Sequence, residues 1–542
     1  MEITATNAVL VSVIESVLWS FFFPHVFPAR TWTSYLFAFL LCNLSIFLVY
    51  RLIVYPFILN PLKHLPQARG FLPIIGHEIT MFRRPPGEPS RKAMLEVDND
   101  GLILTRGFLH DNKLIVTTPA ALADVLVHKS YDMEKPPWTR SFLRKFLGDG
   151  LLVAEGDVHK HHRKHITPAF HFRHIKELYP VFWSKSMEFC NAISGALAEN
   201  EHKMVEIGHY STQVTLDIIG LAGLGRDIGS LRSGEDELIQ NYEEILEPTP
   251  EKAIYFLLHL LFPEWFIKAL PWKLNERVRI TTENLKRICT EFVRQKRERM
   301  KLKIEESVDI LSIMLRTDNF SNSDLVDELL TFLAAGHETT SSALTWSSYL
   351  LSNHPDVQTR LRSEIHKSIP DPGILSDRTM DVASLLENMP YLNAVCNEVL
   401  RLFPTVPVTA RITVRDTTVA GQHIPKDTIL MVVPWAINRN PKLWGPTAED
   451  FVPERWIDQN GRATMNGGAE SNFSFLTFLH GPRSCIGERF ARAELRALLA
   501  ALVGSFEFDM ADPKEEVEVG GTITIKPVNG MKLKMKPVSW GE

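Results

Sequence analysis

The sequence has few cysteines, and none of them lies close to another. The five, Cys42, Cys190, Cys289, Cys396 and Cys485, are odd in number and nowhere spaced as C-x-x-C. This pattern argues against a disulfide-stabilised secreted protein and indicates a reducing compartment. An excess of positive charge is also lacking, because the net charge is -5, so there is no electrostatic case for nucleic acid as a partner. Repeats and low-complexity tracts are absent, and a composition with 45% hydrophobic and 23% charged residues is that of a globular protein.

Charge is missing altogether from one stretch near the amino terminus. Residues 34–50, SYLFAFLLCNLSIFLVY, hold no charged side chain, and the apolar run resumes after Arg51. With Arg51 snorkelling, residues 34–58 are long enough to span a bilayer, which takes about 20 residues. Residues 8–27 are a second candidate, either a span or an interfacial helix. We therefore predict a membrane anchor over residues 1–59, with a buried core helix as the alternative.

The residues after this anchor indicate which side of the membrane carries the body. Lys63, Arg69, Arg83 and Arg84 favour the cytosolic side under the positive-inside rule. The first seven residues lack the basic stretch of a cleaved signal peptide. No linker-like segment follows, so residues 60–542 are predicted to form one large domain.

Helical patterns predominate in that domain. VDELLTFLAAGHETTSSALTWSSYLL, residues 326–351, predicts a long apolar helix capped by Ser323 or Asp324. Further helices are predicted to begin at Pro355 and Pro390. The runs LILTRGF, KLIVTT, TILMVVP and GTITIKP predict a minor β region. The predicted fold class is mainly α with small β sheets (α+β).

Cys485 lies in a rigid setting, FLHGPRSCIG. Gly481 and Gly487 allow the backbone to turn sharply, and Pro482 stiffens the loop between them. A helix is predicted to begin just after the cysteine, and a helix amino terminus favours a thiolate because it lowers the thiol pKa. A thiolate on a rigid loop suits one axial bond to a metal, and equally a nucleophilic cysteine.

The whole ten-residue stretch matches the pattern F-x-x-G-x-R-x-C-x-G. The matching positions are Phe478, Gly481, Arg483, Cys485 and Gly487. The stretch resembles the haem-binding loop of the cytochrome P-450 family, and the resemblance extends over roughly residues 60–537. It implies a cytochrome P-450 catalytic domain that binds haem b, with Cys485 as the thiolate ligand of the iron.

AAGHETT, residues 334–340, lies in the long apolar helix. An acid followed by hydroxyls is costly there unless these groups are satisfied, although a Thr-rich helix is by itself often structural. The motif resembles the oxygen-binding motif of the same family. The resemblance implies that Glu338 and Thr339 are catalytic and relay protons to dioxygen.

Two further arginine patterns resemble the family. Glu398 and Arg401 are three apart on a predicted helix and lie on one face. With Arg455 they resemble the family's Glu–Arg–Arg network, which implies a structural role.

Cations for the haem propionates are expected from three places. The resemblance implies Arg483 in the loop, Arg411, and Arg163, which corresponds to the arginine of a W-x-x-x-R motif. His159 stands where that motif has tryptophan, and an imidazole can donate a hydrogen bond as an indole can.

Residues 159–174 are rich in histidine, and His161 with His165 has the i,i+4 spacing of zinc ligands. No acidic partner of the H-E-x-x-H type is present. A zinc site is therefore one alternative for this segment, and a basic helix facing an electron-donor protein is the other.

The substrate pocket can be suggested only from the resemblance. It implies the region from Trp138 to Leu147 and the residues Phe332, Ala335, Val406, Val408, Thr409, Thr522 and Ile523, each of which could equally be core. Most are apolar, which favours a lipophilic substrate. Residues 247–272 are either a buried helix pair or an access region dipping into the membrane.

Together these patterns predict a membrane-anchored haem-thiolate monooxygenase that hydroxylates, epoxidises or further oxidises a lipophilic small molecule with dioxygen. The sequence resembles fungal members of the family that tailor terpenoid, polyketide or alkaloid secondary metabolites. No flavin or ferredoxin domain follows the resemblance, so we expect electrons from a separate NADPH-dependent diflavin reductase. The expected location is the endoplasmic reticulum membrane, with the catalytic domain in the cytosol. One alternative is an isomerase or dehydratase that does not use dioxygen, and another is a non-catalytic haem or sterol carrier.

Overall fold

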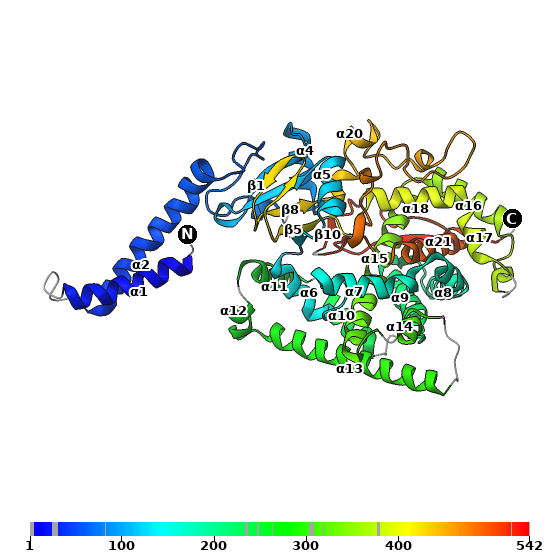
Figure 1. The fold of residues 1–542 in the computed structure, drawn as a ribbon. Coiled ribbons are helices and arrows are strands. Elements are labelled where there is room, and N and C mark those ends of the chain that lie inside the picture. Colours follow the sequence, from blue (N-terminus) through cyan, green and yellow to red (C-terminus); the bar gives the residue numbers. More distant parts are fainter. Residues whose placement is uncertain are drawn as a thin grey trace.

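The computed structural model shows a helical body from which a helical hairpin projects (Figure 1). It describes residues 5–23, 31–81, 83–232, 237–246, 249–262, 264–302, 308–317, 319–376, 380–521 and 523–540. The helices are α1 Ala5–Phe22, α2 Trp32–Val49, α3 Glu78–Met81, α4 Glu88–Glu96, α5 Pro119–Ala123, α6 Pro137–Leu147, α7 Gly156–Ile166, α8 Phe172–Glu199, α9 Ile207–Ile219, α10 Glu237–Leu246, α11 Pro250–Leu261, α12 Glu264–Ala269, α13 Lys273–Lys301, α14 Ile310–Thr317, α15 Asn322–Ser352, α16 Pro355–Ser368, α17 Val382–Glu387, α18 Pro390–Leu402, α19 Pro434–Ile437, α20 Pro441–Trp444 and α21 Glu488–Ser505.

The sheets are small and lie mainly on the side of the body nearest the hairpin (Figure 1). The largest has the order β1-β2-β8-β5-β3, in which β2 and β8 are parallel and the other neighbours are antiparallel. A three-stranded antiparallel sheet has the order β4-β12-β9. The strands are β1 Leu102–Arg106, β2 Asn112–Val116, β3 Met133–Glu134, β4 Met204–Glu206, β5 Thr409–Thr413, β6 Thr417–Val419, β7 Gln422–Ile424, β8 Ile429–Val432, β9 Phe506–Met510, β10 Val519–Gly520, β11 Lys526–Pro527 and β12 Lys532–Pro537. The predicted fold class is confirmed.

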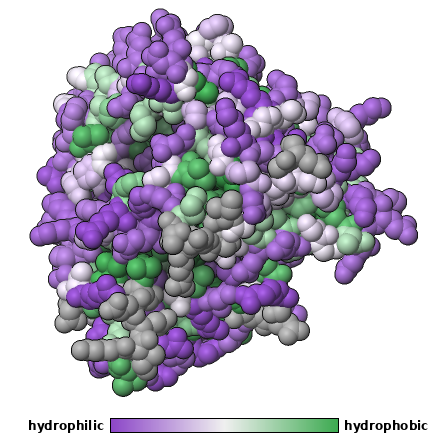
Figure 2. All heavy atoms as spheres, turned by 90° about the vertical axis from the view of Figure 1, so that its right-hand side faces the viewer, coloured by the Kyte–Doolittle hydropathy of each residue, from purple (hydrophilic) through white to green (hydrophobic). Residues whose placement is uncertain are grey.

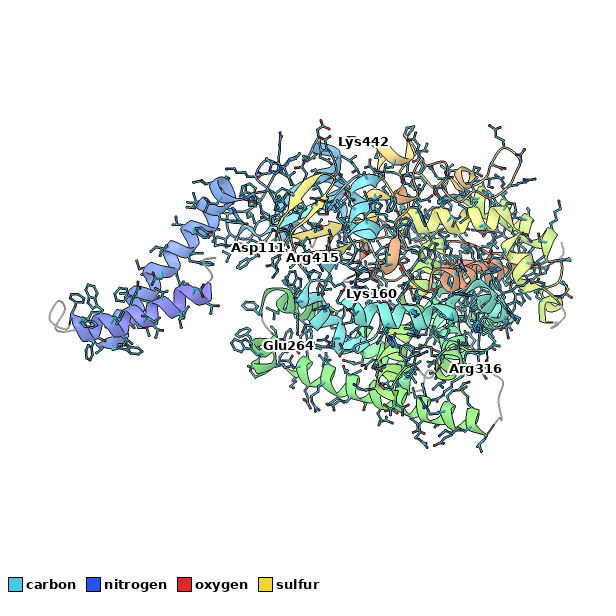
Figure 3. The ribbon with its side chains drawn as sticks, viewed as in Figure 1. Asp111, Lys160, Glu264, Arg316, Arg415 and Lys442 are labelled. Atoms are coloured by element: carbon cyan, nitrogen blue, oxygen red, sulfur yellow. The ribbon has the colours of Figure 1, made fainter. Side chains whose placement is uncertain are left out.

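The projecting hairpin contains the predicted anchor. Residues Trp32–Leu59, which are α2 and its π-helical continuation, form a helix long and apolar enough to cross a membrane. The shorter helix α1 packs along it, and Asn43 of α2 donates hydrogen bonds to Glu15 (2.6 Å) and Ser12 (3.0 Å) of α1. Residues 24–27 of the second candidate span lie outside the described residues. Where the hairpin meets the body, Asp111 (labelled in Figure 3) forms an ion pair with Arg51 of the hairpin.

The central helix of the body is α15, which is buried along most of its length. Its amino terminus forms a capping box in which the Ser321 hydroxyl accepts from the Asp324 backbone N–H and the Asp324 carboxylate accepts from the Ser321 N–H. The prediction of Ser323 or Asp324 as the cap was therefore wrong, because Asp324 is the third residue inside the helix. The predicted starts at Pro355 and Pro390 are confirmed.

The run GTITIKP is mostly a turn. Of its residues that the structure describes, only Lys526–Pro527 is strand, pairing with Val519–Gly520. Ile525 is fully buried, and its backbone N–H donates to the carbonyl of Thr405 at 3.0 Å. The strand-like pattern of this run has a different cause: Ile525 is buried, whereas Thr524 and Lys526 on either side of it point to Glu338.

Hydrophilic and apolar side chains are distributed differently over the body and the hairpin. Figure 2 views the end of the molecule opposite the hairpin, and hydrophilic residues cover most of it. The hairpin, in contrast, exposes large apolar side chains such as Phe21, Phe37 and Phe57. The apolar exposed surface is thus concentrated where a membrane would lie.

Deleting residues 1–59 should release the protein from membranes. We expect full-length protein to stay in the membrane pellet after an alkaline carbonate wash, because extracting the apolar helix Trp32–Leu59 would expose it to water. A variant lacking only residues 1–30 keeps this helix and should also stay in the pellet. Retention of the variant without residues 1–59 in the washed pellet would contradict the anchor assignment.

Candidate active site

The Cys485 loop is held rigidly against its neighbours. The backbone N–H of Cys485 donates to the Phe478 carbonyl at 2.8 Å, which closes the turn. Gly481 has φ +77°, and a Cβ there would collide with the backbone of Leu126, so only glycine fits. His480, at a free position of the sequence pattern, bonds through Nε2 to the carbonyls of Asn472 (2.9 Å) and Phe475 (3.1 Å).

The sulfur of Cys485 faces a cavity and is followed directly by α21. Burial raises the pKa of the Cys485 thiol to about 11, although a hydrogen bond from the Gly487 backbone and the charge of Arg163 act in the opposite direction. Burial thus raises the thiol pKa, where the sequence led us to expect a lowered one. A bound cation at the sulfur is the interaction that would favour the thiolate here.

Basic side chains from separate elements converge on the same cavity. They are Lys135 after β3, His159 and Arg163 of α7, Arg411 of β5 and Arg483 of the cysteine loop. Their mutual repulsion adds to the effect of burial. Burial and then the charge of Arg483 lower the pKa of His159 to about 3, so its imidazole is neutral. Burial and then Arg411 lower the pKa of Lys135 to about 7.

The arginines of this cluster differ in their hydrogen-bond partners. Arg163 donates to the carbonyl of Ser484 at 2.5 Å, and Arg411 donates to the carbonyl of Ala410 at 2.8 Å. Arg483 forms an ion pair with Glu155, with both side chains 5% exposed. The three guanidinium nitrogens of Arg483 are buried and have no hydrogen-bond partner of good geometry among the described residues. A buried guanidinium in this state indicates a missing acceptor.

Across the cavity, α15 presents the acid and hydroxyl of AAGHETT. Glu338 is 8% exposed, and its carboxylate accepts hydrogen bonds from Thr524 (2.9 Å) and Lys526 (3.0 Å). The Thr339 hydroxyl donates to the carbonyl of Ala335 at 2.8 Å. Both residues line the cavity, so the structure brings them together with Cys485 as predicted.

The cavity has a volume of about 530 Å³, and apolar side chains form much of its wall. Of the predicted pocket residues, it is lined by Phe332, Ala335, Val406, Thr409 and Ile523. Within the region 138–147, α6 contributes Phe142, Leu143, Phe146 and Leu147. Thr522 lies outside the described residues.

Val408 is placed differently from the other predicted pocket residues that the structure describes. It is half-buried against the main hydrophobic core and is not among the residues lining the cavity, whereas Val406 and Thr409 on either side of it are.

Comparison with known proteins decides the family. The sequence model of the family described as Cytochrome P-450 matches residues 66–534. The chain belongs to the cytochrome P-450 family. It is 42% identical over 517 residues to the cytochrome P-450 monooxygenase sphH of Aspergillus fumigatus, covering 93% of each chain. It is 36% identical to the cytochrome P-450 monooxygenase ptmK of Penicillium ochrochloron (91% of this chain, 97% of the relative) and 34% identical to FUM15 of Gibberella moniliformis (98% and 99%).

Membership confirms the predicted enzyme class, an oxidoreductase of the monooxygenase type, and the cofactor, haem b bound through a cysteine thiolate. It supports the monooxygenase reading over an isomerase, a dehydratase or a carrier. The cytochrome P-450 fold also accounts for the small sheets beside a long central helix.

The residues present fit such a haem. The guanidinium of Arg483, ion-paired with Glu155 but without a hydrogen bond of good geometry, would with Arg163 and Arg411 supply positive charge for the two propionates of haem. Gly487 also lines the cavity beside the Cys485 sulfur. The charge of the cluster therefore suits an anionic group at this cysteine.

The Glu–Arg–Arg pattern forms a buried network near this cytochrome P-450 site. Glu398 and Arg401 are fully buried and share two hydrogen bonds of 2.8 Å. Arg455 donates to Glu398 at 2.9 Å. Burial alone would raise the pKa of Glu398, but the hydrogen bonds and charges of Arg401 and Arg455 outweigh it and lower the pKa.

The histidines of the histidine-rich segment make separate contacts. His162 is buried and bonds to Glu328 of α15 at 2.7 Å. His161 and His165 lie side by side, with ring centroids 4.3 Å apart. Among the described residues, no group of three or more His, Cys, Asp or Glu side chains is arranged to hold a metal ion.

Sequence reasoning missed several residues that line or support the site. Lys135 and Glu155 lie in loops without a recognisable spacing to the cysteine, and Glu155 gains its role only through the ion pair with Arg483. Thr524 and Lys526 meet Glu338 across 186 and 188 residues of sequence. The one sequence signal for Thr524 and Lys526 was that these polar residues flank the apolar Ile525 in GTITIKP, which indicates that both point to the same side.

Removing the shared carboxylate of the network should destabilise the fold. Glu398→Ala leaves Arg401 buried without a counter-charge, which costs on the order of 3–5 kcal/mol. The matched control, Glu276→Ala, removes the exposed ion pair between Glu276 and Arg279 and should cost far less, because exposed ion pairs add little stability. Thermal unfolding of the haem-loaded proteins checks the order, and equal loss in the two variants would contradict a buried supporting network.

Proposed function

We propose that this protein oxidises a lipophilic small molecule in fungal secondary metabolism, with Cys485 as the proximal haem ligand. The observation that carries the proposal is that one cavity is lined by the Cys485 sulfur, the basic cluster and the acid–hydroxyl pair of α15. The names of its relatives, cytochrome P-450 monooxygenases of fungi, support the same reaction class. When bound, the haem supplies the oxidation chemistry, and the chain positions the reactants.

Each residue of the cavity has a separate task in this proposal. Arg163, Arg411 and Arg483 would hold the haem propionates, and neutral His159 would donate a hydrogen bond to one of them. Phe478, Gly481 and Gly487 shape the loop around the sulfur. Cleavage of dioxygen to leave one water consumes two protons, which Glu338 and Thr339 deliver through the hydroxyl Oγ1 of Thr339.

The cavity wall supports a lipophilic substrate. Beyond Glu338 and Thr339, the chamber is bounded by aromatic and aliphatic side chains of α6, α11 and α13, among them Phe142, Phe146, Tyr255, Phe256 and Val278. Burial of apolar substrate surface against such walls is favourable by roughly 25 cal/mol per Å². The polar groups then orient the carbon to be oxidised.

The surface next to α11 and α12 supports entry from a membrane. Trp265 is 71% exposed, Ile254 is 54% exposed and Phe262 is 43% exposed, while Tyr255 and Phe256 of the same segment line the cavity. We infer that this segment lies on the cytosolic face of the endoplasmic reticulum membrane and admits lipid-dissolved substrates. A separate NADPH-dependent diflavin reductase supplies the electrons.

The test is turnover in microsomes that contain this protein and a diflavin reductase. Lipophilic fungal metabolites are screened for a shift of the haem absorption, and hits are incubated with NADPH under ¹⁸O-labelled dioxygen. We expect product that depends on NADPH and carries one labelled oxygen atom. Product formed without NADPH, or without label, would contradict a monooxygenase.

Replacing the acid of the proton pathway should uncouple the enzyme. Glu338→Gln and Thr339→Ala should lower product formed per NADPH by on the order of 100-fold, because proton delivery by a positioned group contributes about 10²–10⁴-fold. Hydrogen peroxide should appear in place of product. Ser347→Ala on the same helix, whose hydroxyl donates to the Ala343 carbonyl, is the control and should retain coupling. Full coupling in Glu338→Gln would refute this role.

A further inference from the structure

The carboxylate of Glu338 is tied to an element that no part of the haem motif includes. Its oxygens accept from the Thr524 hydroxyl at 2.9 Å and from the Lys526 ammonium at 3.0 Å. These donors come from the turn between β10 and β11, near the end of the chain. All three side chains line the cavity. Glu338 is therefore fixed from the side opposite its own helix.

The turn is itself fastened to α15. The carbonyl of Ile525 accepts hydrogen bonds from Ser342 (2.5 Å) and from the Trp346 indole (3.4 Å), one and two helical turns beyond Glu338. Ile525 is buried, whereas Thr524 and Lys526 on either side of it face the carboxylate. Because residues two apart in extended backbone share one side, anchoring Ile525 places both donors together.

The ammonium of Lys526 forms an ion pair with Glu338. Its side chain is 26% exposed and that of Glu338 is 10% exposed, and no other carboxylate pairs with Lys526 in the part of the chain that the structure describes. The Thr339 hydroxyl donates to its own helix instead of to Glu338. The direction of the Glu338 carboxylate is thus set by the turn and not by Thr339.

We propose that Lys526, assisted by Thr524, is a positioning residue that holds the Glu338 carboxylate at the cavity edge for proton delivery. The inference rests on the proposed role of Glu338. Without Lys526 the carboxylate loses its counter-charge and one of its two fixed donors, so its oxygens no longer keep one direction. Haem binding, which depends on Cys485 and the basic cluster, stays intact.

The test is a double-mutant cycle of Lys526→Met, Glu338→Gln and the combined variant, assayed as haem-loaded protein with the reductase. Lys526→Met should lower product per NADPH about ten-fold, with peroxide in its place, because misplacing a catalytic group by about 1 Å can cost on the order of 100-fold. Lys526→Arg keeps the charge and should restore coupling to within about two-fold. The combined variant should be no worse than Glu338→Gln.

A second readout does not depend on turnover. In the same cycle, the thermal midpoints should be non-additive, because each single variant breaks the same ion pair. Haem content should be unchanged throughout. Thr524→Val, which removes only the hydroxyl, should give a smaller loss of coupling, and it keeps the test open if Lys526→Met folds poorly. Lys534→Met, an exposed lysine of β12, is the matched control and should change neither readout.

The outcomes separate the two proposals. If Glu338→Gln is fully coupled, the proton-relay role of Glu338 fails, and the positioning role fails with it. If Glu338→Gln uncouples and Lys526→Met does not, or if the two effects add fully, the role of Lys526 alone is overturned. Uncoupling by both, without additivity and with rescue by Lys526→Arg, supports the positioning role.

Discussion

The rest of the structure depends on an imbalance of buried charge around one cavity. Three guanidinium groups, those of Arg163, Arg411 and Arg483, line one part of it together with Lys135, and Arg483 is ion-paired with Glu155. Buried charges of one sign are costly unless an opposite charge is present. Burial lowers the pKa of Arg411 to about 10, with Arg483 next in effect, which shows how strongly the site resists its own charge. An anionic group with two carboxylates relieves this imbalance.

Some elements around the cavity hold the structure rigid, and others carry the residues proposed to take part in the reaction. The loop before α21 holds the thiol where burial raises its pKa, so the proposed bond to iron is what would favour the thiolate. The network of Glu398, Arg401 and Arg455 fixes the region beneath it. From the other side, α15 and the β10–β11 turn hold Glu338 and Thr339, the groups proposed to deliver protons. Each part is fastened by hydrogen bonds that do not involve the substrate.

Much of this could be predicted from sequence, because the decisive residues lie in short motifs whose spacing is set by one loop or one helix. The cysteine loop, Glu338 with Thr339, and Glu398 with Arg401 are of this kind. Contacts between distant segments left no such signal, so Glu155, Lys135, Thr524 and Lys526 were missed. Val408 was assigned to the pocket only from the resemblance to the family, which gives the segment but not the direction of each side chain, and it packs against the core.

The most direct test of the account is the absorption spectrum of the reduced protein with carbon monoxide. Wild-type protein should show the signature of a thiolate-ligated haem, and Cys485→Ser should lose that signature. Cys396→Ser, at a cysteine buried in α18, controls for loss of a thiol elsewhere and should keep it. A thiolate signature that survives in Cys485→Ser would contradict the assignment of the haem to this cavity.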